Sequence, residues 1–308
     1  MKKTNIKSWI AQLIKDQPLR AKSVVVTIFG DSIAPHGGSV WLGALIALMA
    51  PFGVTDRLVR TSVFRLAEEG WLDAQREGRR SAYTLTERGE RRFERAYQRI
   101  YAPVESHWDG SWTLVFGLQG TVDAMERGAL RKELLWEGFC MMSPGVFAHP
   151  SFRVDVLNEI LARAGVSEQV FACKASELPG STGRPLADLI EYGWDLQPVV
   201  DGYRQFVAQF LPLSDALERE DPVTPEQAFV IRTLLIHAFR RVQLHDPQLP
   251  VELLPSDWPG ADAYELCRTL YLRTFEAAQQ HLTGILESET GAASAAAPYF
   301  FERFGGLR

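Results

Sequence analysis

Residues 55–85 have the sequence TDRLVRTSVFRLAEEGWLDAQREGRRSAYTL, and this stretch decides the fold of the first third of the chain. An apolar run at 40–49 precedes it and ends at 51–53 (Pro-Phe-Gly), because proline cannot continue a helix and glycine tolerates the turn. Thr55 is a suitable N-cap and Asp56 is favourable in a first helical turn, so a second helix is predicted over 56–69. Two helices joined by a tight turn predict a helix-turn-helix, whose second helix enters the major groove of DNA.

The two faces of the predicted helix 56–69 differ in polarity. At about 100° per residue, Val59, Val63 and Leu66 fall on one side as a buried stripe. The opposite arc is basic and is predicted to contact the groove. It carries Arg57, Arg60, Thr61, Phe64 and Arg65.

A hairpin follows the helix. Residues 71–76 and 79–85 can pair as antiparallel strands around a turn at Glu77-Gly78. Arg76, Arg79 and Arg80 then lie at its tip, where they are predicted to reach the DNA backbone. Thr86 caps a third, arginine-rich helix. The structural alternative is a helix pair with solvated arginines, but a capped basic helix, a basic hairpin and a basic helix in this order favour a winged helix.

In the segment before the apolar run, local propensity and the expected architecture predict different secondary structure. Val24 to Phe29 favours a strand by β-branched propensity, whereas a winged helix needs a helix there. Residues 28–32 (Ile-Phe-Gly-Asp-Ser) also imitate the nucleophile block of lipases and esterases of the GDSL type. Such a hydrolase needs a histidine with an aspartate three residues before it, and none of the six histidines has one. We therefore reject a hydrolase and expect no catalytic site, no metal site and no resident cofactor.

Charge is distributed unevenly along the chain. The formal net charge is -5, with an excess of basic residues over 1–100 and of acidic residues after it. The basic first third is predicted to meet a polyanion, and a chance difference between solvated faces is the alternative. Three cysteines far apart, no apolar leader and no run long enough to span a bilayer predict a cytoplasmic protein.

The rest of the chain predicts two further parts. Strands at 111–117, 145–148 and 170–174 alternate with helices at 123–137 and 154–164, which suggests a ferredoxin-like fold. From residue 185 onward the pattern is almost entirely helical, and the four aromatics in 299–304 are expected to dock on the body or on a partner subunit. The expected fold class is mainly α (α+β). The expected domains are a winged helix-turn-helix at 1–105, a small ferredoxin-like domain at 106–180 and a helical C-terminal domain at 181–308.

Short motifs along most of the chain resemble one family. In the first third they are Gly30-Asp31-Ser32, Trp41-Leu42-Gly43, Val59-Arg60-Thr61, Phe64-Arg65-Leu66 and Glu69-Gly70-Trp71-Leu72. Further on they are Trp108-Asp109-Gly110, Phe239-Arg240-Arg241-Val242, Glu252-Leu253-Leu254-Pro255 and Arg303-Phe304-Gly305-Gly306-Leu307. The sequence resembles the PaaX family, GntR-like repressors of phenylacetate degradation.

This resemblance implies a dimeric cytoplasmic repressor that binds a palindromic operator and is released by phenylacetyl-coenzyme A. It also implies that the central domain is similar to Cas2. Cas2-type nucleases hold metal with an aspartate at the end of the first strand, and residues 113–118 contain none. This departure favours a structural or dimerising role for the central domain.

The effector implied by the resemblance is a polyanion with an aromatic end, so its site needs arginines near an apolar slot. Side chains with this chemistry in the C-terminal part are Arg184, Trp194, Arg204, His237, Arg240 and Arg241. Three other functions stay open from the sequence: a regulator of another aromatic acyl-coenzyme A pathway, an activator, and an enzyme acting on an acyl-thioester.

Overall fold

The computed structural model divides into two compact units. It describes residues 5–16, 19–102, 107–117, 123–150, 152–178, 180, 183, 186–219, 223–290 and 293–307. Unit 1 comprises 1–103, 203–243 and 259–308, and unit 2 comprises 104–202 and 244–258. These units are defined by contacts in space, whereas the three domains expected from the sequence are consecutive segments.

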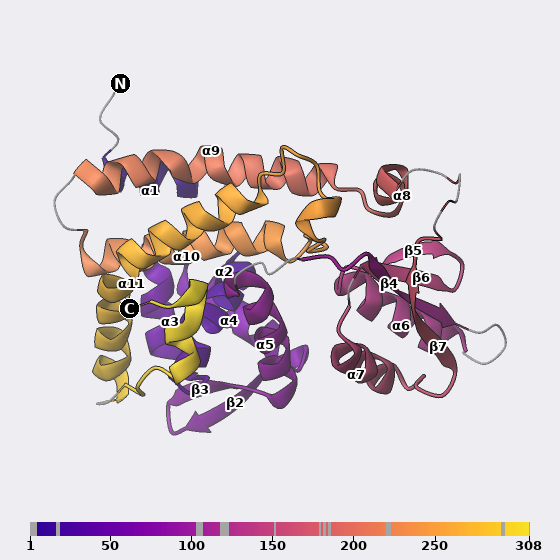
Figure 1. Ribbon diagram of the computed structural model, residues 1–308. Helices are drawn as coiled ribbons and strands as arrows, with labels where there is room; N and C mark the ends of the chain where they lie inside the picture. The colour runs from indigo at the N-terminus through magenta and orange to yellow at the C-terminus, as the bar shows by residue number, and fades with distance from the viewer. Residues whose placement is uncertain are drawn as a thin grey trace. The chain divides into compact units, whose positions relative to one another are not determined.

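The N-terminal part of unit 1 is a winged helix (Figure 1). Its elements are α1 (Ile6–Asp16), α2 (Ala21–Ile28), β1 (Ser39–Trp41), α3 (Leu42–Met49), α4 (Asp56–Glu68), β2 (Leu72–Glu77), β3 (Arg80–Leu85) and α5 (Glu87–Tyr101). The strands form an antiparallel sheet in the order β1-β3-β2, in which Leu72 pairs with Leu85 and Glu77 with Arg80.

The β-branched run near residue 24 is helical. Val24, Val25 and Ile28 are fully buried in α2, which packs against α4. Burial therefore outweighs the local strand propensity, as tertiary context commonly does. A π-helical turn, Phe29–Ile33, and a 3-10 turn, Ala34–His36, continue the chain from α2. The Gly-Asp-Ser motif thus lies in a helical turn, which agrees with the rejection of a hydrolase.

Two other boundaries in the winged helix are informative. The helix expected from residue 40 begins at Leu42, because Ser39–Trp41 pairs with β3. Thr86 caps α5 as predicted, accepting a hydrogen bond from the Gly89 backbone N at 3.0 Å. Gly89 is required there, since a Cβ atom would lie 2.3 Å from the Trp71 carbonyl oxygen.

Unit 2 is built on a four-stranded antiparallel sheet in the order β5-β6-β4-β7 (Figure 1). Its elements are β4 (Ser111–Gly117), α6 (Ala124–Trp136), β5 (Cys140–Ser143), β6 (Val146–Pro150), α7 (Val154–Ala164), β7 (Val170–Ser176) and α8 (Leu186–Gly193). The β-α-β-β-α-β order and this strand order are those of a ferredoxin-like fold, as predicted. The prediction lacked β5, a strand of only four residues.

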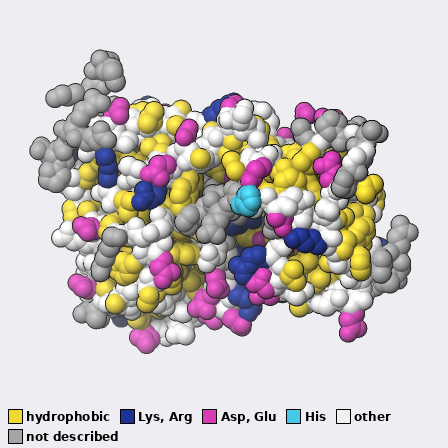
Figure 2. Space-filling model, in the orientation of Figure 1, with side chains coloured by type: hydrophobic (Ala, Val, Ile, Leu, Met, Phe, Trp, Pro, Cys, Tyr) yellow, Lys and Arg dark blue, Asp and Glu magenta, His cyan; other side chains and the backbone are white. Residues whose placement is uncertain are grey.

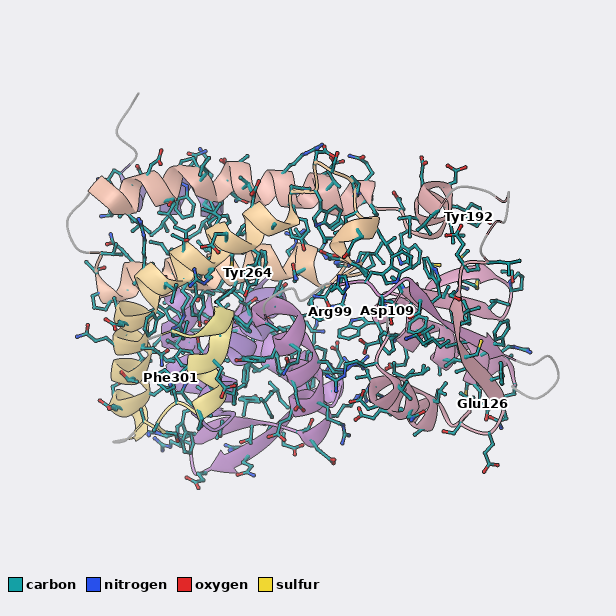
Figure 3. All side chains as sticks on the ribbon, in the orientation of Figure 1. Arg99, Asp109, Glu126, Tyr192, Tyr264 and Phe301 are labelled. Atoms are coloured by element: carbon teal, nitrogen blue, oxygen red, sulfur yellow. The ribbon has the colours of Figure 1, made fainter. Side chains whose placement is uncertain are left out.

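Each face of this sheet carries its own core. Val115 and Phe147 pack with Leu130, Leu134 and Ile160 from α6 and α7. On the other face, Trp112 and Cys140 pack with residues of α8 and of the proline-rich segment 244–258, and Trp194 donates from Nε1 to the Gly138 carbonyl oxygen at 2.8 Å. In the stick view, Asp109 lies just before β4 and Glu126 lies in the first turn of α6 (Figure 3).

The helices of the C-terminal third are α9 (Gln197–Arg219), α10 (Pro225–Gln243) and α11 (Gly260–Thr290), with 3-10 turns at Val251–Leu253 and Pro298–Gly305. Helices α10 and α11 pack extensively against each other and reach α2 and α3 of the winged helix within unit 1. Phe300 and Phe304 are buried in the same unit, so the aromatic tail docks on the body. Tyr264 of α11 donates to the Tyr101 carbonyl oxygen at 3.4 Å (Figure 3).

Candidate nucleic-acid interface

Helix α4 has the two faces that the sequence predicts. Val59, Val63 and Leu66 are at most 2% exposed and pack into the winged-helix core. All five predicted groove residues lie on the exposed side: Arg57, Arg60, Thr61, Phe64 and Arg65. Helical periodicity and burial therefore present them together, outward from the core.

The arginines of this face are open to a ligand. Arg57, Arg60 and Arg65 are exposed and form no ion pair with any residue that the structure describes. Thr61 donates its hydroxyl hydrogen to the Arg57 carbonyl oxygen at 2.9 Å, which leaves the hydroxyl oxygen able to accept. Guanidinium groups with free donors on a helix surface suit phosphate and base-edge contacts.

The hairpin adds three more exposed arginines. Gly78 turns the chain at φ +57°, between β2 and β3. Arg76 donates from Nε to the Gly78 carbonyl oxygen at 3.2 Å, and the Arg80 guanidinium lies 6.0 Å from the Trp41 ring centroid. Arg79 is also exposed at the turn. The hairpin tip is therefore basic, as predicted.

Most arginines of α5 are engaged within the protein, whereas Arg88 in its first turn is exposed. Arg91 forms an ion pair with Glu87, the Arg92 guanidinium lies 4.6 Å from the Trp71 ring centroid, and Arg99 is 6% exposed. On the face in view in Figure 2, acidic and basic side chains are mixed. The candidate interface therefore has two parts, the outer face of α4 and the hairpin tip. The outer face of α4 carries Arg57, Arg60, Thr61, Phe64 and Arg65, and the hairpin tip carries Arg76, Arg79 and Arg80.

One residue of the outer face was missed in the sequence. Leu58 lies in the first turn of α4 and is 50% exposed, beside the basic side chains. A helical wheel places it 100° from Arg57, at the edge of the basic arc, and this position was the available signal.

The predicted effector residues do not form one cluster. Thr27 of α2 is contacted by two of them: His237 through Nδ1 at 3.0 Å and Arg240 through Nε at 2.8 Å. Arg240 also donates to the Ser23 carbonyl oxygen at 2.9 Å, so both side chains hold α10 against α2. Arg204 and Arg241 are exposed in unit 1, and Trp194 is buried in unit 2. Arg184 lies outside the described residues.

Burial determines the protonation of these α10 groups. Burial, reinforced by the charges of Arg240 and Arg241, lowers the pKa of His237 to about 4. Burial also lowers the pKa of Arg240 to about 10, which leaves it charged at neutral pH. A neutral histidine and a charged arginine thus share the Thr27 hydroxyl.

The strongest electrostatic cluster in unit 1 is centred on Asp31 of the Gly-Asp-Ser motif. Arg303 Nη1 lies 3.0 Å from Asp31 Oδ1, and Arg232 Nε lies 2.9 Å from Oδ2 as an ion pair. Tyr101 and Tyr271 donate their hydroxyl hydrogens to Oδ1 at 2.8 and 3.0 Å. We call these five residues the Asp31 cluster.

All members of the Asp31 cluster are almost completely buried. Burial alone would raise the pKa of Asp31, but the charges of Arg232 and Arg303 hold it below its ordinary value. Two guanidinium groups surround one carboxylate, and the Arg303 guanidinium also lies 4.2 Å from the Tyr101 ring centroid. The cluster joins the π-helical turn Phe29–Ile33 to α5, α10, α11 and the C-terminal 3-10 turn Pro298–Gly305. It is therefore a structural core of unit 1.

Other kinds of site find no support in the described part of the chain. Within it, no three histidine, cysteine, aspartate or glutamate side chains gather as metal ligands. Nor does any described helix combine the length and apolar character needed to cross a membrane.

A winged helix with an exposed basic recognition helix and a basic hairpin defines a DNA-binding protein by its architecture. Family models agree along the chain: the PaaX-like protein model matches residues 20–89, the PaaX protein central Cas2-like domain matches 105–187, and the PaaX-like protein C-terminal domain matches 194–284.

A curated relative and a solved structure are similar to this chain. The chain is 38% identical over 306 residues to the transcriptional repressor PaaX of Escherichia coli (strain K12), covering 99% of this chain and 96% of the relative. The uncharacterized protein Rv0674 from Mycobacterium tuberculosis shares the fold, with a TM-score of 0.51, 24% identity and coverage of 83% of this chain and 98% of that one. The chain belongs to the PaaX family, and it is a transcription regulator rather than an enzyme.

Proposed function

We propose that the chain represses phenylacetate catabolic genes by binding operator DNA as a homodimer, and that phenylacetyl-coenzyme A releases it. The outer face of α4 carries the DNA-binding part of this proposal, since its exposed arginines have no ion-pair partner among the described residues. Membership of the PaaX family, with a relative named as a repressor, supports the regulatory part.

The proposed contacts divide into two groups. Arg57, Arg60, Thr61, Phe64 and Arg65 contact the major groove, and Arg76, Arg79 and Arg80 contact the DNA backbone. Each phosphate neutralised by an arginine releases condensed counterions, so the logarithm of affinity falls by about 0.9 per contact for each tenfold rise in salt. Steep salt dependence is therefore the signature of this interface.

The proposed dimer places two α4 helices in successive major grooves, about 34 Å apart along a palindromic operator. We assign dimerisation to the central Cas2-like domain. Its first strand, Ser111–Gly117, lacks the aspartate that a Cas2-type nuclease uses for metal, which leaves the sheet a structural role.

The effector must favour a dimer geometry that no longer matches the operator spacing. Lowering operator affinity about 100-fold requires about 2.7 kcal/mol of coupling free energy. Arg204 and Arg241, both exposed in unit 1, are proposed to contact the phosphates of the effector. His237 and Arg240 hold α10 against α2, so an effector bound there would alter the packing of the winged helix itself. The protein is proposed to act in the cytoplasm without a resident cofactor.

Fluorescence anisotropy on the protein's own upstream intergenic DNA tests this function. We expect tight binding that phenylacetyl-coenzyme A releases and that free phenylacetate and coenzyme A leave intact. Tight binding that phenylacetyl-coenzyme A does not weaken would contradict its proposed role as the effector. It would favour a regulator of another aromatic acyl-coenzyme A pathway. Absent binding at low salt would contradict the repressor.

A further inference from the structure

Two apolar side chains stand out on the basic face of α4. Leu58 is 50% exposed and Phe64 is 59% exposed, although large apolar side chains are usually buried. The core of the winged helix already has its own stripe from α4, so the fold does not require either residue. Both side chains are therefore available to a partner that binds the basic face of α4.

Their position on the helix relates them to the arginines. At about 100° per residue, Phe64 lies between Arg57 and Arg60 on the wheel, and Leu58 lies beside Arg65. Six residues separate Leu58 from Phe64, which is about 9 Å along the helix axis. On the wheel, Phe64 is therefore flanked by two arginines, and Leu58 borders one.

The surrounding charge indicates which occupant this face takes. Arg57, Arg60 and Arg65 have no ion-pair partner among the described residues. At an apolar protein contact each guanidinium group would be desolvated without compensation, so such a contact is unfavourable. In the DNA major groove they meet phosphates and guanine edges, and the apolar group that the bases present there is the C5-methyl of thymine. Leu58 also lies in the first turn, and the N-terminal residues of a recognition helix are those that contact base edges.

We infer that Leu58 and Phe64 read thymine methyl groups in the operator, while the arginines around them hold the phosphates and other base edges. This inference rests on the proposed DNA-binding function and adds to it a sequence preference. Two thymines at separate positions in each half-site are the expected targets, because the side chains are about 9 Å apart along the helix.

Removal of the thymine methyl groups tests this inference directly. The protein's own upstream intergenic fragment is amplified with either dTTP or dUTP, and the affinity of the full-length protein for both fragments is measured. Burial of one methyl group against an apolar side chain corresponds to about fourfold in affinity. Two such contacts correspond to about 16-fold per half-site, so a homodimer on two half-sites should bind the uracil fragment up to about 250-fold more weakly than the thymine fragment.

The variants Leu58→Ala and Phe64→Ala should each reduce this thymine-to-uracil ratio, because the contacting side chain is already absent. Leu211→Ala is the matched control, since Leu211 of α9 is 52% exposed and should leave the ratio unchanged. Thermal unfolding of all three variants should match wild type, because the three side chains are exposed.

The outcomes separate the inference from the proposed function. Salt-sensitive binding with the same ratio in wild type and both variants would overturn methyl recognition and leave the repressor standing. A change in oligomeric state in Leu58→Ala or Phe64→Ala, with an unchanged ratio, would instead assign the two side chains to a protein contact. No salt-sensitive binding to either fragment would contradict the proposed function itself.

Discussion

Arginine has opposite roles on the outer face of α4 and in the Asp31 cluster. On α4, Arg57, Arg60 and Arg65 are exposed and have no ion-pair partner among the described residues. In the cluster, Arg232 and Arg303 are completely buried and bound to one carboxylate. A solvated guanidinium keeps its charge available for a polyanion, whereas a buried one must be compensated inside the protein. Burial and partners therefore separate the arginines proposed to bind DNA from the structural ones.

The largest expected effect comes from removing the shared carboxylate. Asp31→Ala leaves two buried guanidinium groups without their counterion, so the free energy of unfolding should fall by about 3–5 kcal/mol. Chemical denaturation measures this loss, and Asp56→Ala on exposed α4 is the control. A loss below about 1 kcal/mol for Asp31→Ala would show that the cluster does not stabilise unit 1.

A smaller effect is expected from acidification. His237 has a pKa of about 4 in the folded protein and an ordinary value of 6.5, so the unfolded chain takes up the proton first. Stability should therefore fall as pH drops from 6.5 towards 4, by about 2 kcal/mol at pH 5 from this residue.

Urea denaturation at pH 7 and pH 5 measures the contribution of His237. His237→Gln should show a shallower pH dependence than wild type. His36 and His281, whose pKa values burial also lowers, supply the slope that remains. An unchanged slope in His237→Gln would refute the assignment.

The smallest effect on stability is expected on the outer face of α4. Replacing Arg57, Arg60 and Arg65 together by Gln should change the free energy of unfolding by no more than about 0.5 kcal/mol, because the side chains are exposed and unpaired within the described chain. Thermal and chemical denaturation of the triple variant check this. A loss comparable to that of Asp31→Ala would abolish the contrast between the two regions.

The contrast between the α4 face and the Asp31 cluster also explains which features could be predicted from the sequence. The α4 face and the hairpin follow from local periodicity and turn residues, so both were predictable. The Asp31 cluster was not, because its other four members lie between 70 and 272 residues away from Asp31 along the chain. Within the Gly-Asp-Ser motif, the local sequence suggested a hydrolase block and gave no indication of a buried ion pair.

The candidate effector residues show the same limit. His237 and Arg240 were chosen for their chemistry, and the structure places both against Thr27 of α2, a contact 210 and 213 residues apart in sequence. The helix at Ala21–Ile28 was likewise ambiguous, because its burial against α4 and α10 outweighs the strand propensity of three consecutive valines. Local pattern therefore predicts surfaces and elements better than it predicts long-range partners.

The most direct test of the account compares DNA affinity in two triple variants that remove equal charge. Arg57, Arg60 and Arg65 of α4 are replaced by Gln in one, and Arg127, Arg131 and Lys132, exposed on α6, in the other. Anisotropy is measured with the upstream intergenic DNA at two salt concentrations. We predict that the α4 variant loses about 100-fold in affinity and much of the salt dependence, while the α6 variant binds like wild type. Equal losses in both variants would mean that net charge, and not the outer face of α4, binds the DNA.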